Sequence, residues 1–312
     1  SVAHRFSGAS RLTEARVIRT TAELAMLLDG GPLAPRLEPQ RVLMSTPDSF
    51  DVVDVKNALM EGRVGTVDRA KARAQWEALG CAFESAGHEV VVIPGAEGCE
   101  DMVFTANQVL PGLGPDGRPY VVLSHMRHPS RRREVPYFRD WFESHGYRIL
   151  ELPESVPYFE GQGDAIWHPG RQLLWGGFGQ RTSVEAYASL STMLEVPVVA
   201  LELVHPSFYH LDTAFCALSE DAVLVFPGAF SQAGMALIRR GFARVLEVSE
   251  AEAAAGFACN AHALDGRTVL IQRGSPHTVA ALTDAGFEVV EVETGEFIKS
   301  GGSVFCMKMM IY

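Results

Sequence analysis

The feature that most constrains the fold is a short pattern that recurs five times along the chain. Each copy reads as an alternating, β-branched strand, a loop of about ten residues and a second apolar strand. The copies, whose starts lie about fifty residues apart, are GHEVVVIPGAEGCEDMVF, GYRILELPESVPYFEGQGDAIW, VPVVALELVHPSFYHLDTAFCAL, ARVLEVSEAEAAAGFACNAHAL and GFEVVEVETGEFIKSGGSVFCMKM. Further strands such as RVLMST and TVLIQRG, and helical segments such as DRAKARAQWEALGCAFESAG, lie between them. The repeated unit is therefore strand, helix, strand, loop, strand.

A single unit of this size cannot bury its apolar face, whereas five units closed around an axis can. We therefore predict one α/β domain over residues 1–312, folded as a five-bladed β/α propeller with pseudo-fivefold symmetry. An open α/β sheet is the alternative that strand and helix alternation leaves open. Residues 1–40 carry no motif that we interpret.

Charge and cysteine content narrow the class of function. The net charge of −11 argues against nucleic-acid or anionic-membrane partners, which need a positive surface. No apolar run reaches bilayer length and the first residues lack the apolar core of a secretory signal, so we expect a soluble, cytoplasmic protein. The five scattered cysteines have no metal-ligand spacing, and no glycine-rich phosphate loop is present, so we expect no metal and no cofactor.

The repeats also predict where a functional site lies. Equivalent loops of a closed ring converge near its axis, so their polar residues are expected to meet although they are distant in sequence. In chain order, the loops contribute Asp101, Asn107, Glu160, Asp164, His210, Asp212, Asn260 and Cys306.

This set of residue types favours attack on a cationic planar group. A cysteine thiolate is a nucleophile, and a nearby histidine accepts and returns its proton. Carboxylates accept the N–H donors of a guanidinium, whereas an acyl transfer site needs donors for its oxyanion. The set therefore predicts that Cys306 attacks a guanidino carbon while His210 acts as acid and then as base.

Each residue also has a purely structural interpretation. Cys306, in SGGSVFCMKMMIY, is either a packed strand thiol or a nucleophile on a turn softened by two glycines. His210 lies between aromatic residues, as a core histidine does. Arg131 opens the run RRR of a solvated helix start, and Arg181 follows GGFGQ as a surface residue does.

Several of these motifs resemble the guanidino-group-modifying enzymes, or penteins. The matching segments are DMVFTAN, FEGQGD, FYHLDT, SGGSVFCMKM, SRRRE and GQRTS. They span most of the chain from Asp101 onward, and VLMSTPDSFDVVDVKN is similar to the family's opening strand and loop. The resemblance implies the five-bladed propeller, a small cationic guanidino substrate and no metal or organic cofactor. A symmetric homo-oligomer is typical of an enzyme of this size.

The resemblance also implies roles for individual residues. Cys306 matches the nucleophile, His210 the general acid and base, and Glu160 the carboxylate that orients the histidine. For substrate binding, the matching or neighbouring positions are Asp101, Asn107, Asp212, Asn57, and the arginines Arg131 and Arg181, which match residues that hold the substrate α-carboxylate.

Two departures from the family pattern bear on the substrate. Asn107 stands where deiminases and dimethylarginine hydrolases usually have an aspartate, and EGQGD is one residue longer than EGGD, which leaves the equivalent of Glu160 open by one position. The FTAN form resembles the arginine dihydrolases, which take arginine through two hydrolytic rounds to ornithine, ammonia and carbon dioxide. An amide donates to the neutral ureido carbonyl of the second round, which a carboxylate cannot do.

The alternatives differ in the fate of the substrate. HPSRRREV resembles the dimethylarginine hydrolases, which makes dimethylargininase the second hypothesis, although Asp212 fills space that N-methyl groups need. Amidino transfer to an amine is the third. A noncatalytic arginine-binding protein is the fourth, because fold does not imply function.

Overall fold

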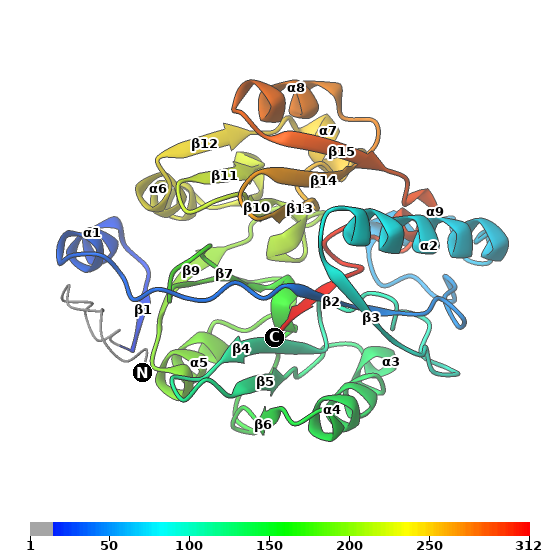
Figure 1. The fold of residues 1–312 in the computed structure, drawn as a ribbon, viewed down its shortest axis with the longest axis horizontal. Helices are drawn as coiled ribbons and strands as arrows, with labels where there is room; N and C mark the ends of the chain where they lie inside the picture. The colour runs from blue at the N-terminus through cyan, green and yellow to red at the C-terminus, as the bar shows by residue number, and fades with distance from the viewer. Residues whose placement is uncertain (1–14) are drawn as a thin grey trace.

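The structure is a computed structural model that describes residues 15–312. Within these residues the strands form five sheets (Figure 1). The part of residues 1–40 that precedes residue 15 lies outside the described residues.

Every sheet is built on the predicted unit. A middle strand pairs in parallel with an outer strand and antiparallel with an inner strand. The inner strands are β4 (Val109–Leu113), β7 (Ala165–Trp167), β10 (Phe215–Ala217), β13 (His262–Leu264) and β16 (Met309–Ile311). The middle strands are β2 (Arg41–Ser45), β5 (Pro119–Leu123), β8 (Leu174–Phe178), β11 (Ala222–Val225) and β14 (Thr268–Gln272). The outer strands are β3 (Glu89–Ile93), β6 (Arg148–Leu150), β9 (Pro197–Glu202), β12 (Arg244–Glu247) and β15 (Glu288–Val292).

A helix connects each middle strand to its parallel outer strand, as a parallel pair requires. These crossover helices are α2 (Arg69–Ser85), α4 (Val135–Ser144), α5 (Glu185–Leu194), α6 (Gln232–Gly241) and α8 (Pro276–Asp284), and they lie at the periphery in Figure 1. Shorter helical turns are α3 (Pro129–Arg132), α7 (Glu250–Ala254), α9 (Gly295–Ile298), η1 (Ala58–Met60), η2 (Gly161–Gly163), η3 (Leu211–Thr213) and η4 (Pro227–Ala229).

Helix α2 shows how local sequence sets these elements. The Asp68 side chain accepts a hydrogen bond from the Lys71 N–H and caps the helix start. Ala72, Leu79 and Phe83 recur at helical spacing and are buried, so one face of α2 packs on the sheet.

The last strand of the chain lies in the same sheet as the early strand β2. Strand β16 pairs antiparallel with β2, placing Met309 opposite Leu43, and Figure 1 shows the C-terminus near the middle of the view. Inner strands of neighbouring sheets also touch, β10 against β13 and β16 against β4. The loops that precede the inner strands are thereby brought toward one another.

The segment before residue 40, for which the sequence predicted nothing, adds an edge strand. Strand β1 (Arg16–Ile18) pairs in parallel with β9, and helix α1 (Thr21–Asp29) packs against α6. Thr20 and Glu23 form a capping box at the start of α1.

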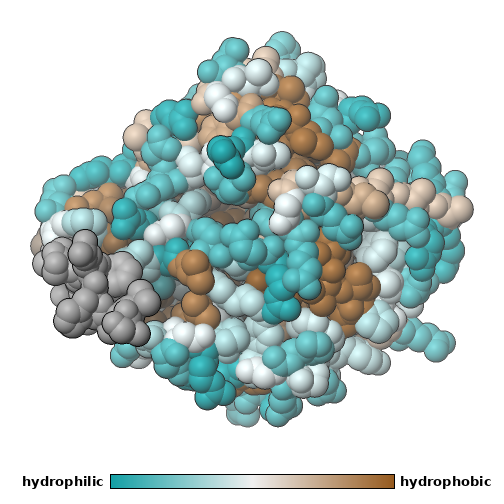
Figure 2. Space-filling view, in the orientation of Figure 1, coloured by the Kyte–Doolittle hydropathy of each residue, from teal (hydrophilic) through white to brown (hydrophobic). Residues whose placement is uncertain are grey.

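The face drawn in Figure 2 is mostly hydrophilic, with hydrophobic patches between the polar side chains. No helix within residues 15–312 combines the length and apolar character needed to cross a bilayer.

Candidate active site

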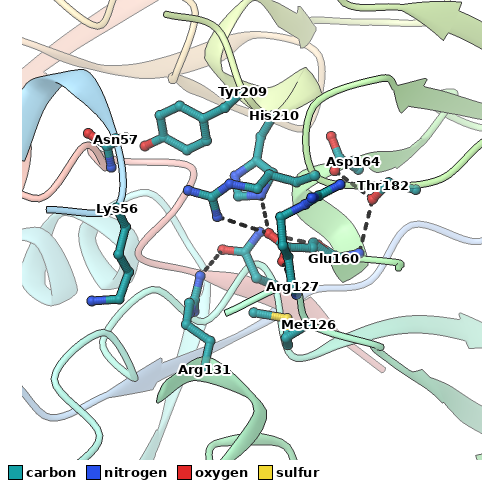
Figure 3. A network of polar contacts seen from close by, with 12 residues as sticks. Lys56, Asn57, Met126, Arg127, Arg131, Glu160, Asp164, Thr182, Tyr209 and His210 are labelled. Carbon is teal, nitrogen blue, oxygen red and sulfur yellow. Dashed lines mark hydrogen bonds and ion pairs between the residues drawn. The ribbon is translucent and has the colours of Figure 1, made fainter. Parts of the chain in front are cut away.

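The loops before the inner strands converge on one pocket, here called the Cys306 pocket. Its lining residues are Lys56, Asn57, Met60, Asp101, Phe104, Asn107, Arg131, Arg181, Tyr209, His210, Ser300, Gly301, Gly302 and Cys306. Of the residues predicted at the site, Glu160, Asp164, Asp212 and Asn260 do not line it. Glu160, Asp212 and Asn260 are bonded to lining residues. In Figure 3, Lys56 and Asn57 face the Glu160 and His210 pair from the opposite side.

His210 and Glu160 form a buried pair. Nε2 of His210 lies 2.7 Å from Oε1 of Glu160, and Nη1 of Arg181 donates to the same oxygen at 3.2 Å. The other carboxylate oxygen accepts the Arg127 backbone N–H at 2.9 Å. These contacts fix the orientation of the imidazole ring.

The electrostatics of this pair keep the Glu160 carboxyl ionised. Burial acts to raise the pKa of Glu160, but the hydrogen bond and charge of His210 and the Arg181 guanidinium outweigh it and hold that pKa well below its usual value. A carboxylate that contacts a guanidinium, an imidazole and a backbone N–H remains charged even without solvent.

The two carboxylates of the EGQGD loop have different partners. Glu160 faces His210, whereas Asp164 accepts hydrogen bonds from the Thr182 hydroxyl at 2.6 Å and the Leu211 N–H at 2.9 Å. Thr182 in turn accepts the Glu160 backbone N–H at 3.1 Å. Asp164 therefore joins the two loops that carry Glu160 and His210, and does not line the pocket.

Cys306 lies in a turn before β16, not in the strand itself. Its Sγ is 3.3 Å from Oδ2 of Asp212 and accepts from Nδ2 of Asn260 at 3.2 Å. Oδ1 of Asn260 accepts the backbone N–H groups of Ser303, at 3.0 Å, and Cys306, at 3.4 Å. Asn260, from the fourth repeat loop, thus positions the cysteine turn.

The thiol and its neighbouring carboxyl both favour their protonated forms. Burial, and then the Asp212 charge, raise the pKa of the Cys306 thiol well above its ordinary value. Burial raises the pKa of Asp212 to about 7, against a lowering by its hydrogen bond to Cys306 and by the Lys308 charge. Oδ1 of Asp212 is buried and has no hydrogen-bond partner among residues 15–312. An unpartnered buried acceptor beside a thiol is a place for an N–H donor of a ligand.

The two glycines before Cys306 are required by close approach. Gly301 has φ +90°, and its carbonyl accepts the Tyr209 hydroxyl. A β-carbon at Gly302 would lie 2.4 Å from the Phe104 ring and 3.1 Å from Cβ of Cys306. Larger residues at either position would displace the cysteine turn.

Asn107 is held in one orientation by its neighbours. Its Oδ1 accepts from Nη1 of Arg131 at 2.8 Å, and its Nδ2 donates to the Glu160 carbonyl at 3.1 Å. One N–H of the amide remains available.

The RRR run divides between the interior and the surface. Arg131 is buried, bonds both carboxylate oxygens of Glu134 and donates to the Phe104 carbonyl, whereas Arg132 and Arg133 are exposed. The contacts of Arg131 favour a role in positioning Asn107, and its binding of a substrate carboxylate stays a prediction. The same prediction for Arg181 also remains, although Arg181 packs over the Tyr209 ring at 4.8 Å and bonds Glu160.

The wall of the Cys306 pocket opposite the Glu160 and His210 pair is held by contacts that the sequence did not predict. Nζ of Lys56 pairs with Glu100 at 3.1 Å and with Asp101 at 3.3 Å. The Asn57 amide donates to the Ser300 carbonyl at 3.3 Å, and the Ser300 hydroxyl donates to Asp101 at 3.0 Å. These bonds hold the segment before η1 against the cysteine turn. Lys56, Tyr209 and Ser300 belong to the pocket without any motif that singles them out.

The residues suit a polar organic substrate. Within residues 15–312, no cluster of three or more His, Cys, Asp or Glu side chains is arranged to hold a metal ion. The pocket instead combines a thiol, an imidazole and a carboxylate, and the unpartnered acceptor of Asp212 lies behind the thiol.

Comparison with known proteins agrees with the motifs. A family model described as "N,N dimethylarginine dimethylhydrolase, eukaryotic" matches residues 48–312. The N(G),N(G)-dimethylarginine dimethylaminohydrolase of Mycobacterium tuberculosis is 35% identical over 297 residues, which is 95% of this chain and 94% of the relative.

Two further matches concern arginine dihydrolases of cyanobacteria. The bifunctional arginine dihydrolase/ornithine cyclodeaminase AgrE of Nostoc sp. is 38% identical over 273 residues, 87% of this chain but 38% of the relative, so this chain spans well under half of AgrE. A crystal structure of the N-terminal domain of ArgZ, in a variant covalently bonded to a reaction intermediate, superposes with a TM-score of 0.81 at 35% identity, covering 87% of this chain and 97% of that one. From the family match and these relatives, the chain belongs to the N,N-dimethylarginine dimethylhydrolase family of guanidino-group-modifying enzymes.

Proposed function

We propose that the chain is an arginine dihydrolase, a cysteine-dependent hydrolase that converts arginine to ornithine, ammonia and carbon dioxide. The observation that carries the proposal is the unpartnered Oδ1 of Asp212 beside the Cys306 thiol, in a pocket where Asn107 supplies an amide. The similarity to AgrE and ArgZ supports the same activity.

Substrate binding and thiol activation are coupled in this proposal. A guanidinium that donates to Oδ1 of Asp212 brings positive charge next to Cys306, whose pKa is raised by burial and by the Asp212 charge. A nearby cation favours the thiolate and the Asp212 carboxylate together. The nucleophile therefore forms when the substrate arrives, and stays a protected thiol in the empty pocket.

The first round exchanges one C–N bond for a C–O bond. Cys306 gives its proton to His210 and its thiolate attacks the guanidino carbon; a terminal nitrogen then takes that proton from His210, and ammonia leaves a covalent thiouronium. His210 then removes a proton from water, the hydroxide attacks the same carbon, and the C–S bond breaks to return the thiol and citrulline. Glu160 holds the imidazole in place through both proton transfers.

The second round acts on a neutral ureido group. The thiolate attacks the ureido carbon, and the terminal nitrogen takes a proton from His210 and leaves as the second ammonia, so that a thiocarbamate remains on Cys306. His210 then removes a proton from water, the hydroxide attacks the same carbon, the C–S bond breaks, and the carbamate released decomposes to carbon dioxide and ornithine. The free N–H of Asn107 donates to the ureido oxygen, on which negative charge develops. A carboxylate at position 107 would repel that oxygen.

The same proposal includes the architecture. The order of the five units and the contacts between neighbouring inner strands support a five-bladed β/α propeller with a pseudo-fivefold axis between those strands. Closure of the first sheet by β16 supports a single catalytic domain. A homo-oligomeric state and a cytoplasmic location stay predictions.

Dimethylargininase is the second candidate, because the family model and the Mycobacterium tuberculosis relative carry that activity in their names. Asp212 argues against it. The carboxylate is fully buried and occupies one side of Cys306, where N-methyl groups would have no donor for it.

A two-substrate assay tests the proposal. The purified chain is incubated with L-arginine or with asymmetric dimethylarginine, with Cys306→Ser as the blank, and products are identified by mass spectrometry. Ornithine from arginine is the expected result. Citrulline and dimethylamine from the methylated substrate alone would assign dimethylargininase, a guanidino product on an added amine would assign amidino transfer, and unchanged arginine would leave a binding protein.

A further inference from the structure

A second cavity, here called the Lys308 cavity, lies along the inner strands beyond the active-site loops. Its volume is about 560 Å³, and its lining includes residues of β7, β10, β13 and β16 and of the turn before β16. No residue lines both this cavity and the Cys306 pocket. A cavity of this size is in the range that holds a small organic ligand.

Lys308 presents a buried amine to this cavity without a counter-charge. The side chain is 2% exposed, and its Nζ lies 3.8 Å from the centroid of the Phe305 ring. Within residues 15–312 its ammonium makes no hydrogen bond or ion pair. Burial lowers the pKa of Lys308 to about 7. The aromatic contact replaces only part of the lost hydration.

Two histidines beside Lys308 are also incompletely bonded. His262 is 7% exposed, and its Nε2 has no hydrogen-bond partner among the described residues. His88 binds the Gln40 carbonyl through Nδ1 at 2.8 Å, and its Nε2 is likewise unpartnered within residues 15–312. The rings lie 5.7 Å apart. Burial, followed by the positive charge of Lys308, lowers the pKa of His262 well below its usual value.

The carboxylates that line the cavity do not neutralise the Lys308 ammonium. Glu38, Glu220 and Asp265 lie at the rim, with side chains 47%, 57% and 49% exposed, and each pairs with an arginine. The buried Asp212 acts on Lys308 through charge, but its carboxylate is directed to Cys306. The interior of the cavity thus holds several groups that an anion would stabilise, but no buried carboxylate that pairs with them.

The walls of the cavity define the rest of a ligand. Ile166, Phe305 and Met310 line it and are buried. An inorganic anion would leave this apolar surface against water, whereas an organic acid would cover it.

We propose that the Lys308 cavity binds a small organic carboxylate, with its carboxylate between Lys308 and His262 and its apolar chain along Ile166, Phe305 and Met310.

Titration calorimetry on the full chain tests the proposal with acetate, hexanoate and inorganic phosphate as probes. Each methylene that becomes buried should tighten binding about fourfold, so hexanoate should bind at least tenfold more tightly than acetate. Lys308→Met should weaken hexanoate binding by at least tenfold, whereas Lys71→Met, which removes an exposed lysine of α2, should leave it unchanged. His262→Gln gives the same test if the first variant does not fold.

Two further readouts separate this cavity from the catalytic site. An Arg181→Ala variant should retain hexanoate binding, because Arg181 belongs to the Cys306 pocket. At pH 8 an anion that makes Lys308 take up a proton should give a binding enthalpy that changes with the ionisation enthalpy of the buffer. Hexanoate binding that survives Lys308→Met, that is lost in Arg181→Ala, or that is matched by phosphate would overturn the proposal, as would no heat at millimolar hexanoate.

Discussion

The Cys306 pocket lies among the loops before the inner strands and the Lys308 cavity lies along those strands, and their buried charges are arranged in opposite ways. Against the pocket lining, Glu160 is ionised beside His210 and Arg181, and Asp212 beside Cys306 has one acceptor without a partner among residues 15–312. Lys308 and His262 both line the cavity, and the carboxylates that line it lie exposed at its rim. The first site is prepared for a cation and the second for an anion.

The difference shows how one scaffold supports two kinds of site. Residues of the loops before the inner strands set the charge of the pocket, and residues of the strands and of the Cys306 turn set that of the cavity. Lys308 follows Cys306 by two positions, so the turn that presents the nucleophile also presents the buried amine.

The largest expected effect is on the nucleophile. Cys306→Ser should lower kcat by about 10³-fold or more, because a serine hydroxyl does not ionise in this pocket. Cys81→Ser removes an exposed thiol outside both sites and should keep the parent kcat. Steady-state ammonia release measures both, and substantial turnover by Cys306→Ser would mean that another group attacks the substrate.

Asn107→Asp tests the amide in the pocket. A carboxylate there would still accept from Arg131 but would face the Glu160 carbonyl oxygen, to which the amide now donates. We expect ornithine formation to fall by about 10²-fold and citrulline to accumulate. Chromatography of the two products over time measures this, and an unchanged ornithine rate would show that the amide is not needed in the second round.

Lys308→Met tests the lowered pKa of Lys308 through the free energy of unfolding. The pKa of Lys308 in the folded chain is about 7, well below that of an exposed lysine, about 10.4, so the unfolded chain binds more protons between these values and the parent gains stability as pH rises through them. The variant lacks this pH-dependent gain. The free energy of unfolding of the variant relative to that of the parent should therefore fall by on the order of 2 kcal/mol from pH 6 to pH 9. Urea unfolding at several pH values measures it, with Lys71→Met as the control. A difference that does not vary with pH would mean that the amine keeps its ordinary pKa.

The smallest effect concerns the pH dependence of kcat/KM. Asp212 must be ionised to bind a guanidinium, and burial raises its pKa to about 7, so kcat/KM should fall about tenfold per unit as pH drops below 7. Lys308→Met should move this limb to higher pH, because the Lys308 charge lowers the pKa of Asp212. If the remaining activity of Asp212→Asn shows the same fall in kcat/KM below pH 7, the group that titrates is not Asp212.

Much of the pocket followed from the sequence because its residues occupy equivalent loops of a repeat. Asp101, Glu160, His210, Asn260 and Cys306 each precede an inner strand, and the repeat pattern predicts that such loops meet. The structure brings them together through the bonds described above.

The partners of these residues were not predictable in the same way. Lys56 and Tyr209 belong to the pocket through contacts with Glu100 and Gly301, which are distant along the chain. The use of Arg131 to hold Asn107 depends on the burial of Glu134, which a run of three arginines does not reveal. Strand β1 pairs with β9 across much of the sequence, and its three residues carry too short a pattern to predict a strand.

The most direct test follows the guanidino carbon itself. Arginine labelled with carbon-13 at that position is incubated with the enzyme, and the labelled products are followed by NMR. The proposed two rounds predict that the label leaves as carbon dioxide and bicarbonate, with two ammonia released for each ornithine. Label that stops in citrulline, with one ammonia for each arginine, would contradict the second round.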